Sequence, residues 1–490
     1  MKPTFTFLFL LSFLFVQAQD CPPGDVTFET QAQLNSFIQQ FPNCQVINGT
    51  LTLRHTSNDG YSNITNLSPL SNITTINGDL ILSRLGNVAT LSGLSNLQVV
   101  NGNVSLRRNS NYFTNYSNFN YVQGLNSLTT ITGTLFIGDF LKDLSGMSNL
   151  TQLGGIAMWY SNIESFEGLE NITTLNHFDV QYNSILSFNG LQNLQTINGN
   201  FTLDVNPLTG EIIPLDLMSN LSNITTVTGD FYITGSRQQM VNNMPSFNIN
   251  FLSNLTSVGQ NFGLVHFNVG DFSALSNLQS VGGNASFSVY ATSLQGLSNQ
   301  VINKELYLSI DNVTDFSGLE DFTNLKNLTI HHCADLVSLN GLQNLISVNG
   351  TISIQYNPFL SDISALGNVK PDFVLGNDNL DLIISNNPSL STCTNDFVCG
   401  ILRLPLREII ISNNTEGCSN KPTVFDACEA IEDVVITEEP IDYSYDNNIL
   451  TVTNKEVTSI NAFSMIGQNV LTTNMHNQMD MNQLGVRVFM

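Results

Sequence analysis

The chain has 490 residues, and its 15 Lys and Arg residues are outnumbered by 39 Asp and Glu residues, which gives a formal net charge of −24. Nucleic acid is bound through clustered Lys and Arg, and anionic lipid attracts basic segments, so this composition argues against both partners. The length alone would predict about three globular domains, but internal repetition replaces that expectation with one long repeat array.

The N-terminus has the pattern of an export signal. Lys2 precedes the apolar run Phe5–Val16, which suits the core of a signal peptide and is too short for a transmembrane helix. Residues 1–19 are therefore expected to be a signal peptide. Lipid attachment at Cys21 is the less favoured alternative, because the residues before it are not the small apolar set of a lipobox. No other segment is apolar enough to cross a membrane, which predicts a secreted or outer-surface protein.

Residues 20–47 are expected to cap the N-terminal end of the array. A helix is predicted within residues 28–41, where Thr30 and Gln33 fit a capping box. The apolar residues of this segment have the spacing of one helix face, and they are Leu34, Phe37, Ile38 and Phe41. This face would cover the first repeat, because a repeat array needs its end closed.

The seven cysteines of an exported chain predict three disulfides and one free thiol. The favoured pairs are Cys21–Cys44, Cys393–Cys399 and Cys418–Cys428. The four cysteines of the C-terminal group allow three connectivities, and sequence alone leaves all three open. Cys333 is the residue left over.

A repeat with a period in the low twenties occupies residues 48–428. The motif Gly-Leu-x-Asn-Leu, or a near variant, begins at Gly124, Gly146, Gly168 and Gly190, and a second run begins at Ala274, Gly296, Gly318, Gly341 and Ala365. Leucine-rich repeats have this period. With strands about 4.8 Å apart, the roughly 14 to 15 coils would stack into a parallel β-solenoid about 70 Å long.

Each repeat contains a short strand with alternating apolar residues. Leu51 and Leu53 are expected to point inward and Thr52 outward, and the pattern recurs along the chain. Glycines precede these strands, for which a positive φ is expected, and they are Gly49, Gly78, Gly102, Gly133, Gly199, Gly229 and Gly350. An inward Asn follows the strand and is expected to form a hydrogen-bonded ladder, at Asn109, Asn183, Asn206, Asn357 and Asn387.

The segment from Cys21 through Cys44-Gln-Val-Ile-Asn-Gly-Thr-Leu-Thr-Leu, with the repeats that follow it, resembles the receptor L-domain family. The resemblance covers about residues 21–428. It implies a right-handed β-solenoid of leucine-rich character without catalytic activity. It carries over no ligand, because these domains bind through surface residues that vary freely. The array is longer than one L domain and looks like two or more fused end to end.

The C-terminal residues differ in composition. Residues 429–442 are expected to form an acidic linker, and residues 443–490 contain several short strand patterns. These strands resemble the C-terminal sorting domain of the bacterial type IX secretion system, a small β-sandwich, which implies that the type IX machinery is a partner. The chain departs from that family by ending at Met490 soon after Gly-Val-x-x-Phe, which indicates a truncated or altered domain.

Residues with catalytic or metal-binding chemistry are scarce. His331-His332-Cys333 is the one cluster of metal-type ligands, and Cys333 occupies the place that Asn357 has in the next repeat. We therefore predict a ladder thiol there, since a zinc site would need a fourth ligand. No nucleophile elbow, zinc-binding helix or phosphate loop is present in the sequence. No catalytic residue, metal or cofactor is predicted.

The outward residues of the strands are the candidate binding surface. Exposed aromatic side chains among small polar groups suit a carbohydrate or peptide. The candidate residues are Arg54, Arg107, Tyr112, Tyr116, Phe136, Trp159, Tyr232, Tyr307 and His331, with 108–122 as a candidate recognition loop. The leading hypothesis is a secreted or cell-surface binding protein, an adhesin or a recognition module for an extracellular glycan or protein. A β-helix enzyme that degrades polysaccharide and a structural surface-layer component are the alternatives.

Overall fold

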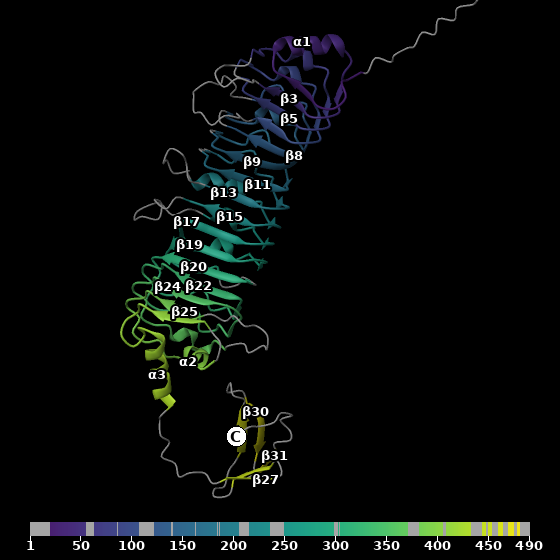
Figure 1. Ribbon diagram of the computed structural model, residues 1–490. Helices are drawn as coiled ribbons and strands as arrows, with labels where there is room; N and C mark the ends of the chain where they lie inside the picture. The colour runs from purple at the N-terminus through teal and green to yellow at the C-terminus, as the bar shows by residue number, and fades with distance from the viewer. Residues whose placement is uncertain are drawn as a thin grey trace, which may run out of the picture.

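The computed structural model describes most of the chain from Asp20 to Asp480. The described residues are 20–54, 63–85, 87–106, 122–138, 141–161, 163–183, 185, 187–204, 215–235, 249–297, 302, 304–370, 382–404, 408–432, 443–446, 449–452, 459–463, 469–474 and 478–480. Within them the protein is mainly β, and residues up to Ser412 form a parallel β-solenoid (Figure 1).

One wall of the solenoid is a long parallel sheet, here called the main sheet. It belongs to a 19-stranded sheet that also includes the short strands β2, β4 and β6. Its members, in the order in which they pair, are β1 (Val26–Phe28), β3 (Leu51–Arg54), β5 (Leu80–Ser83), β7 (Val104–Leu106), β8 (Thr130–Ile137), β9 (Gln152–Trp159), β11 (His177–Gln181), β13 (Phe201–Asp204), β15 (Phe231–Thr234), β17 (Phe262–Gly270), β19 (Ala285–Ala291), β20 (Glu305–Asp311), β22 (Asn327–His331), β24 (Ile352–Gln355), β25 (Leu382–Ser385) and β26 (Ile409–Ser412). Every one of these pairings is parallel, as stacked coils require.

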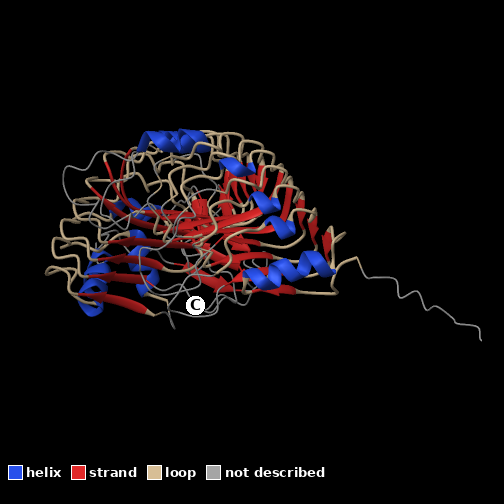
Figure 2. Ribbon diagram, turned by 90° about the horizontal axis from the view of Figure 1, so that it is seen from above, coloured by secondary structure: helices blue, strands red, loops and turns tan. Residues whose placement is uncertain are grey.

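A second wall is made of two-residue strands. These are β2 (Val46–Ile47), β4 (Thr75–Ile76), β6 (Val99–Val100), β10 (Thr174–Leu175), β12 (Thr196–Ile197), β14 (Thr226–Val227), β16 (Ser257–Val258), β18 (Ser280–Val281), β21 (Asn324–Leu325) and β23 (Ser347–Val348). Short 3₁₀ helices, drawn blue in Figure 2, complete many coils. They are η1 (Ser68–Leu70), η2 (Ser92–Leu94), η3 (Ser145–Met147), η4 (Leu215–Leu221), η6 (Asn250–Leu252), η7 (Ser273–Leu275) and η8 (Ser364–Asn368).

The core runs the length of the solenoid and contains a stack of phenylalanines. Phe178, Phe201, Phe231 and Phe262 occupy the same inward position of four successive main-sheet strands and are fully buried. Their ring centroids are 4.9, 4.7 and 5.3 Å apart, with interplanar angles of 15° or less. Aromatic pairs at such distances attract each other beyond their hydrophobic burial.

The glycines of the repeat serve two different purposes. The expected positive φ at the pre-strand glycines is wrong: none of those seven has it. They are required by close approach instead, and a Cβ on Gly78 would lie 2.6 Å from the backbone of Gly49 in the preceding coil. Positive φ occurs at several of the glycines that open Gly-Leu-x-Asn-Leu or a near variant, as at Gly168, where φ is +105°. A Cβ there would lie 1.9 Å from the carbonyl oxygen of Leu144.

The inward asparagines form the expected ladder where they are described. The N–H of Asn357 donates to Oδ1 of Asn387 at 3.1 Å, and the N–H of Asn387 donates to Oδ1 of Asn414 at 3.0 Å. The amide of Asn387 also donates to the carbonyl oxygen of Ile354 at 3.0 Å. Asn183 caps the N–H of Ser161 in the same way. Asn109 and Asn206 lie outside the described residues.

A second asparagine ladder runs along the outside of the coils. The Asn of Leu-x-Asn-Leu donates its side-chain amide to a backbone carbonyl of the preceding coil, as Asn171 does to Ser148 at 2.8 Å and Asn277 to Ser253 at 2.7 Å. The same bond is made by Asn72, Asn96, Asn149, Asn193, Asn223, Asn254, Asn344 and Asn368. The two ladders provide hydrogen-bond partners for backbone groups at different corners of each coil. Backbone polar groups that are shielded from water need such partners.

The N-terminal cap agrees with the sequence prediction. Helix α1 (Gln31–Gln40) begins after Thr30, and both bonds of the capping box with Gln33 are present. Leu34 and Phe37 are buried against the first coils. The predicted Cys21–Cys44 disulfide is also present.

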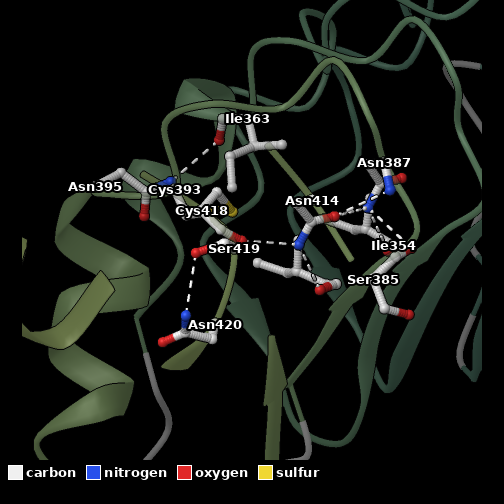
Figure 3. The surroundings of a disulfide bond; sticks show 11 residues. Ile354, Ile363, Ser385, Asn387, Cys393, Asn395, Asn414, Cys418, Ser419 and Asn420 are labelled. Atoms are coloured by element: carbon white, nitrogen blue, oxygen red, sulfur yellow. Dashed lines mark hydrogen bonds between the residues drawn. A yellow bond between two sulfur atoms is a disulfide. The ribbon is translucent and has the colours of Figure 1, made fainter. Parts of the chain in front are cut away.

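The C-terminal cap differs from the prediction in its disulfides. The structure pairs Cys393 with Cys418 and Cys399 with Cys428, so the predicted Cys393–Cys399 and Cys418–Cys428 pairs are wrong. The partners are separated by 25 and 29 residues, about one coil, and each bond therefore ties one coil or helix to the next instead of closing a local loop. Figure 3 shows Cys393–Cys418 beside the end of the inner asparagine ladder.

Two helices close this end of the solenoid. Helix α2 (Asp396–Leu402) is capped by Asn395, whose side chain accepts from the N–H of Val398, and Cys399 joins α2 to helix α3 (Lys421–Glu432). Because α3 continues to Glu432, the first residues of the expected linker, 429–432, are helical. The rest of that linker and the expected signal peptide lie outside the described residues.

The described strands near the C-terminus are antiparallel, unlike those of the solenoid. They are β27 (Tyr443–Asp446), β28 (Ile449–Val452), β29 (Ser459–Phe463), β30 (Asn469–Asn474) and β31 (Gln478–Asp480). β28 pairs with β27 and β31, and β29 pairs with β30.

Candidate functional site

The outward residues of the main sheet form two rows along the solenoid axis. Row A contains Phe136, Ala157, Asp179, Thr202, Tyr232, Gly263, Ser286, Tyr307, Thr329, Ser353, Ile383 and Ile410. Row B lies two residues further along each strand and, with the register continued, contains Trp159, Gln181, Asp204, Thr234, Val265, Ser288, Ser309, His331, Gln355, Ser385 and Ser412. Parallel, in-register strands place equivalent residues of successive coils side by side.

Of the predicted basic residues, Arg54 occupies the row B position of β3, because Thr52, two residues earlier, is in register with Phe136 through Ile81 and Ser105. Arg54 ends β3, close to the N-terminal cap, and its guanidinium lies 3.1 Å from Oε1 of Glu29. An exposed ion pair of this kind contributes little to stability, and its position separates it from the aromatic residues. Arg107, Tyr112 and Tyr116, like most of the candidate loop 108–122, lie outside the described residues.

Phe136 and Trp159 are brought together on the outer face. Their ring centroids are 6.4 Å apart and the rings are stacked at 29°. Phe136 is the register partner of Ala157, a small residue that is 3% exposed although it points outward. Both aromatic side chains remain half-buried, so they offer surface to a ligand while resting on the sheet.

Two tyrosines that the sequence analysis did not select extend this group. Tyr160 and Tyr182 directly follow β9 and β11, with exposed fractions of 49% and 39%. Their rings stack across the two coils with centroids 5.2 Å apart and an interplanar angle of 9°. Both residues have positive φ, 55° and 53°. We call Phe136, Trp159, Tyr160 and Tyr182 the first aromatic cluster.

A second group lies further along the same rows. Tyr307, His331, His332 and Tyr356 come from three successive coils, and we call them the second aromatic cluster. The Tyr307 and His331 centroids are 6.4 Å apart, and those of His332 and Tyr356 are 4.8 Å apart. Burial, and then the neighbouring His332, lowers the pKa of His331, so its imidazole is neutral at pH 7.

Tyr232 has a different environment from the two clusters. A Cβ on Gly263, its register partner in the next strand, would lie 2.3 Å from the Tyr232 ring, so the ring lies across that glycine. Burial, and then the charge of Asp230, raises the pKa of Tyr232. The side chain thus fills a space on the sheet and is separated from both clusters. The same arrangement recurs where His177 covers Gly155.

Cys333 is a member of the inner ladder. Its Sγ accepts from the N–H of Ile310 at 3.3 Å, and its own N–H donates to Oδ1 of Asn357 at 2.9 Å. The side chain is fully buried, and this burial raises the pKa of the thiol to about 12. Among the described residues, no group of three or more His, Cys, Asp or Glu side chains is placed to hold a metal ion.

We expect Cys333 to be unreactive toward a thiol reagent at pH 8 in the native protein, and to react fully once the chain is unfolded. A thiol ionises near pH 8.5 in an unfolded chain, so burial of the neutral form stabilises the fold below that pH. This contribution declines as the pH rises from about 8.5 toward 12, because only the unfolded chain loses its proton there. Mass spectrometry after maleimide labelling would measure the reaction. Rapid labelling of Cys333 in the native state would contradict its place in the ladder.

Within the residues that the structure describes, no helix is both long enough and apolar enough to span a membrane.

Comparison with solved structures finds two proteins that align with this chain at low identity. An internalin from Listeria monocytogenes aligns over 72% of this chain and 86% of its own, with 15% identity and a TM-score of 0.32. A leucine-rich-repeat protein from Leptospira interrogans aligns over 78% of this chain and 99% of its own, with 15% identity and a TM-score of 0.33. No curated protein matches the sequence. Residues 43–123, which include the first coils and part of the cap, match the receptor L domain family.

Proposed function

We propose that the protein is a secreted or cell-surface binding protein and that it binds its partner through the outer face of the main sheet. The main support for this proposal is the presence of two aromatic clusters, which lie on rows A and B and on the residues that directly follow the main-sheet strands. Receptor L domains are a family of binding domains, and residues 43–123 match that family. Three disulfides support an extracellular location, because disulfides persist in oxidising compartments.

The route to the surface remains part of the proposal. The N-terminal apolar run Phe5–Val16 supports export, and the strand pattern of residues 443–490 supports sorting by the type IX machinery. The described strands β27 to β31 pair antiparallel, as a small β-sandwich requires.

The test is a binding screen with two matched variants. The purified full chain would be applied to arrays of extracellular glycans and extracellular proteins. The Phe136→Ala/Trp159→Ala variant should bind the identified partner at least about tenfold more weakly, because buried aromatic anchors contribute roughly 2 kcal/mol or more at interfaces. Ile346→Ala is the control, since Ile346 is 49% exposed but precedes β23 on the second wall.

Equal binding by wild type and the double variant would show that the partner does not use this face. A chain that converts a polysaccharide substrate, and loses this activity on substitution of one carboxylate, would replace the binding proposal with an enzymatic one.

A further inference from the structure

The corner that follows each main-sheet strand has one backbone conformation along much of the solenoid. The residue directly after the strand is left-handed at Arg84, Tyr160, Tyr182, Asn312, His332, Tyr356, Asn386 and Asn413, with φ between 53° and 68°. The next residue then turns inward and, in several coils, belongs to the inner asparagine ladder. The corner therefore demands a positive φ whatever side chain it carries.

Asparagine meets this demand at low cost, and tyrosine does not. Asn, Asp and His are enriched several-fold in the left-handed region, whereas a bulky residue there is an outlier. The backbone bond at the corner is the same with either residue. The N–H of Tyr356 donates to the Ser385 carbonyl at 3.2 Å, and the N–H of Asn386 donates to the Ser412 carbonyl at 3.1 Å.

The tyrosines are thus not needed to make the turn. Asn312, Asn386 and Asn413 make it in other coils. Tyr160, Tyr182 and Tyr356 add backbone strain and expose 49%, 39% and 44% of their surface. Strained residues of this kind persist where function requires the side chain.

The two aromatic clusters lie in one line. Tyr182 follows β11 and Tyr356 follows β24, and seven strand-to-strand steps separate them. At about 4.8 Å per step this is about 34 Å. A single ligand that touches both clusters must be extended along the solenoid axis.

The charge of this line is low. From β9 to β26, the described positions of rows A and B include no Lys or Arg, and their carboxylates are Asp179 and Asp204. Oδ1 of Asp179 already accepts from the amide of Gln181 at 2.7 Å. An anionic ligand would find no opposite charge here, and it would be repelled by the net charge of −24. Between the aromatic rings lie hydroxyl and amide groups, among them Thr202, Ser286 and Gln355.

We propose that the line from the first to the second aromatic cluster binds a linear, uncharged polysaccharide. The aromatic rings would contact the apolar C–H surface of sugar rings, since the negative face of a π system attracts such groups. The hydroxyl and amide groups of rows A and B would bind sugar hydroxyls. A ligand that repeats along its length matches a surface that repeats with every coil. This inference rests on the proposed binding function and narrows it to one class of partner.

The experiment is affinity electrophoresis, which measures how far the full chain migrates in native gels that contain mannan, xylan, a β-glucan or the acidic polygalacturonate. At least one of the three neutral polymers should retard the protein, and polygalacturonate should not. Tyr160→Asn/Tyr182→Asn and Tyr356→Asn should each weaken the retardation about tenfold. Short oligosaccharides of the same sugar should compete poorly, because they cannot reach both clusters. Arg84→Asn, at the same corner outside the clusters, should bind like wild type.

Stability separates this role from a structural one. The Tyr→Asn variants should melt at the wild-type temperature or above it, because Asn is the cheaper corner residue. A clear drop in their melting temperature would show that the tyrosines serve the fold. Retardation by polygalacturonate alone would overturn the polysaccharide inference and leave the binding function standing. The same conclusion would follow if no polymer retarded the protein but an extracellular protein bound to it and this binding was lost in the Tyr→Asn variants. If the protein bound neither a polysaccharide nor an extracellular protein, both the polysaccharide inference and the proposed binding function would be wrong.

Discussion

Phe201→Ala is expected to lower the free energy of unfolding by about 3 to 5 kcal/mol, the usual range for removal of a buried phenylalanine. The side chain of Phe201 is fully buried. It lies between Phe178 and Phe231, whose ring centroids are 4.9 and 4.7 Å away. Truncation leaves a cavity that the neighbouring rings cannot fill, because each is held by its own coil. Equilibrium denaturation of the full chain, followed by circular dichroism, would measure the loss.

Thr202→Ala is the matched control for this experiment. Thr202 is the next residue of β13 and points outward in row A. Its substitution should change the free energy of unfolding by no more than about 0.5 kcal/mol, as is usual for surface positions. A similar loss in both variants would mean that strand propensity, and not the phenylalanine stack, stabilises these coils. Because repeats couple mainly to their neighbours, the Phe201→Ala transition should also become broader or split in two.

The sequence was sufficient to predict the coil and its inner ladder. The alternation of Leu51 and Leu53, and the Asn at a fixed distance after the strand, follow from local spacing that every coil repeats. Cys333 could be placed in the ladder for the same reason, since it stands where Asn357 stands one coil later. Hydrophobic periodicity and repeat length are the strongest signals that a sequence contains.

The disulfides and the corner tyrosines required information that local spacing does not contain. Cys393 and Cys399 are neighbours in sequence, whereas stacking brings residues about one coil apart into contact, as in Cys393–Cys418. Tyr160 and Tyr182 could not be assigned a side by alternation, because a left-handed residue ends the period-two pattern. A signal was nonetheless available: each of these tyrosines directly precedes a buried polar residue, Ser161 or Asn183, as Asn386 precedes Asn387.

For the outer asparagine ladder, too, the sequence shows the repeated residue but not the hydrogen bond that the residue makes. The Asn of Gly-Leu-x-Asn-Leu marks the repeat in sequence, but its bond to the preceding coil depends on how coils stack. This ladder and the inner one attach each coil to its neighbour through side-chain amides in place of charges. A chain with 11% charged residues can therefore hold its coils together largely through side-chain amides.

Asn387→Leu is expected to destabilise the C-terminal coils by about 3 to 5 kcal/mol. The substitution keeps the side-chain volume roughly constant and removes both the acceptor for the Asn357 N–H and the donor to the Ile354 carbonyl. Each buried backbone group that loses its partner costs about 1 to 3 kcal/mol. Hydrogen exchange measured by mass spectrometry should show the largest increase in β24 and β25, next to the substituted residue.

Asn387→Cys provides the matched comparison, because the chain already uses a cysteine at this position two coils earlier. Sγ of Cys333 accepts the N–H of Ile310 at 3.3 Å, so a thiol at residue 387 should still accept the N–H of Asn357. We therefore expect Asn387→Cys to lose less stability than Asn387→Leu. Equal losses would mean that shape at the corner matters more than the acceptor. A smaller loss for cysteine would establish that the ladder stabilises each coil by providing an acceptor for the backbone of the coil before it.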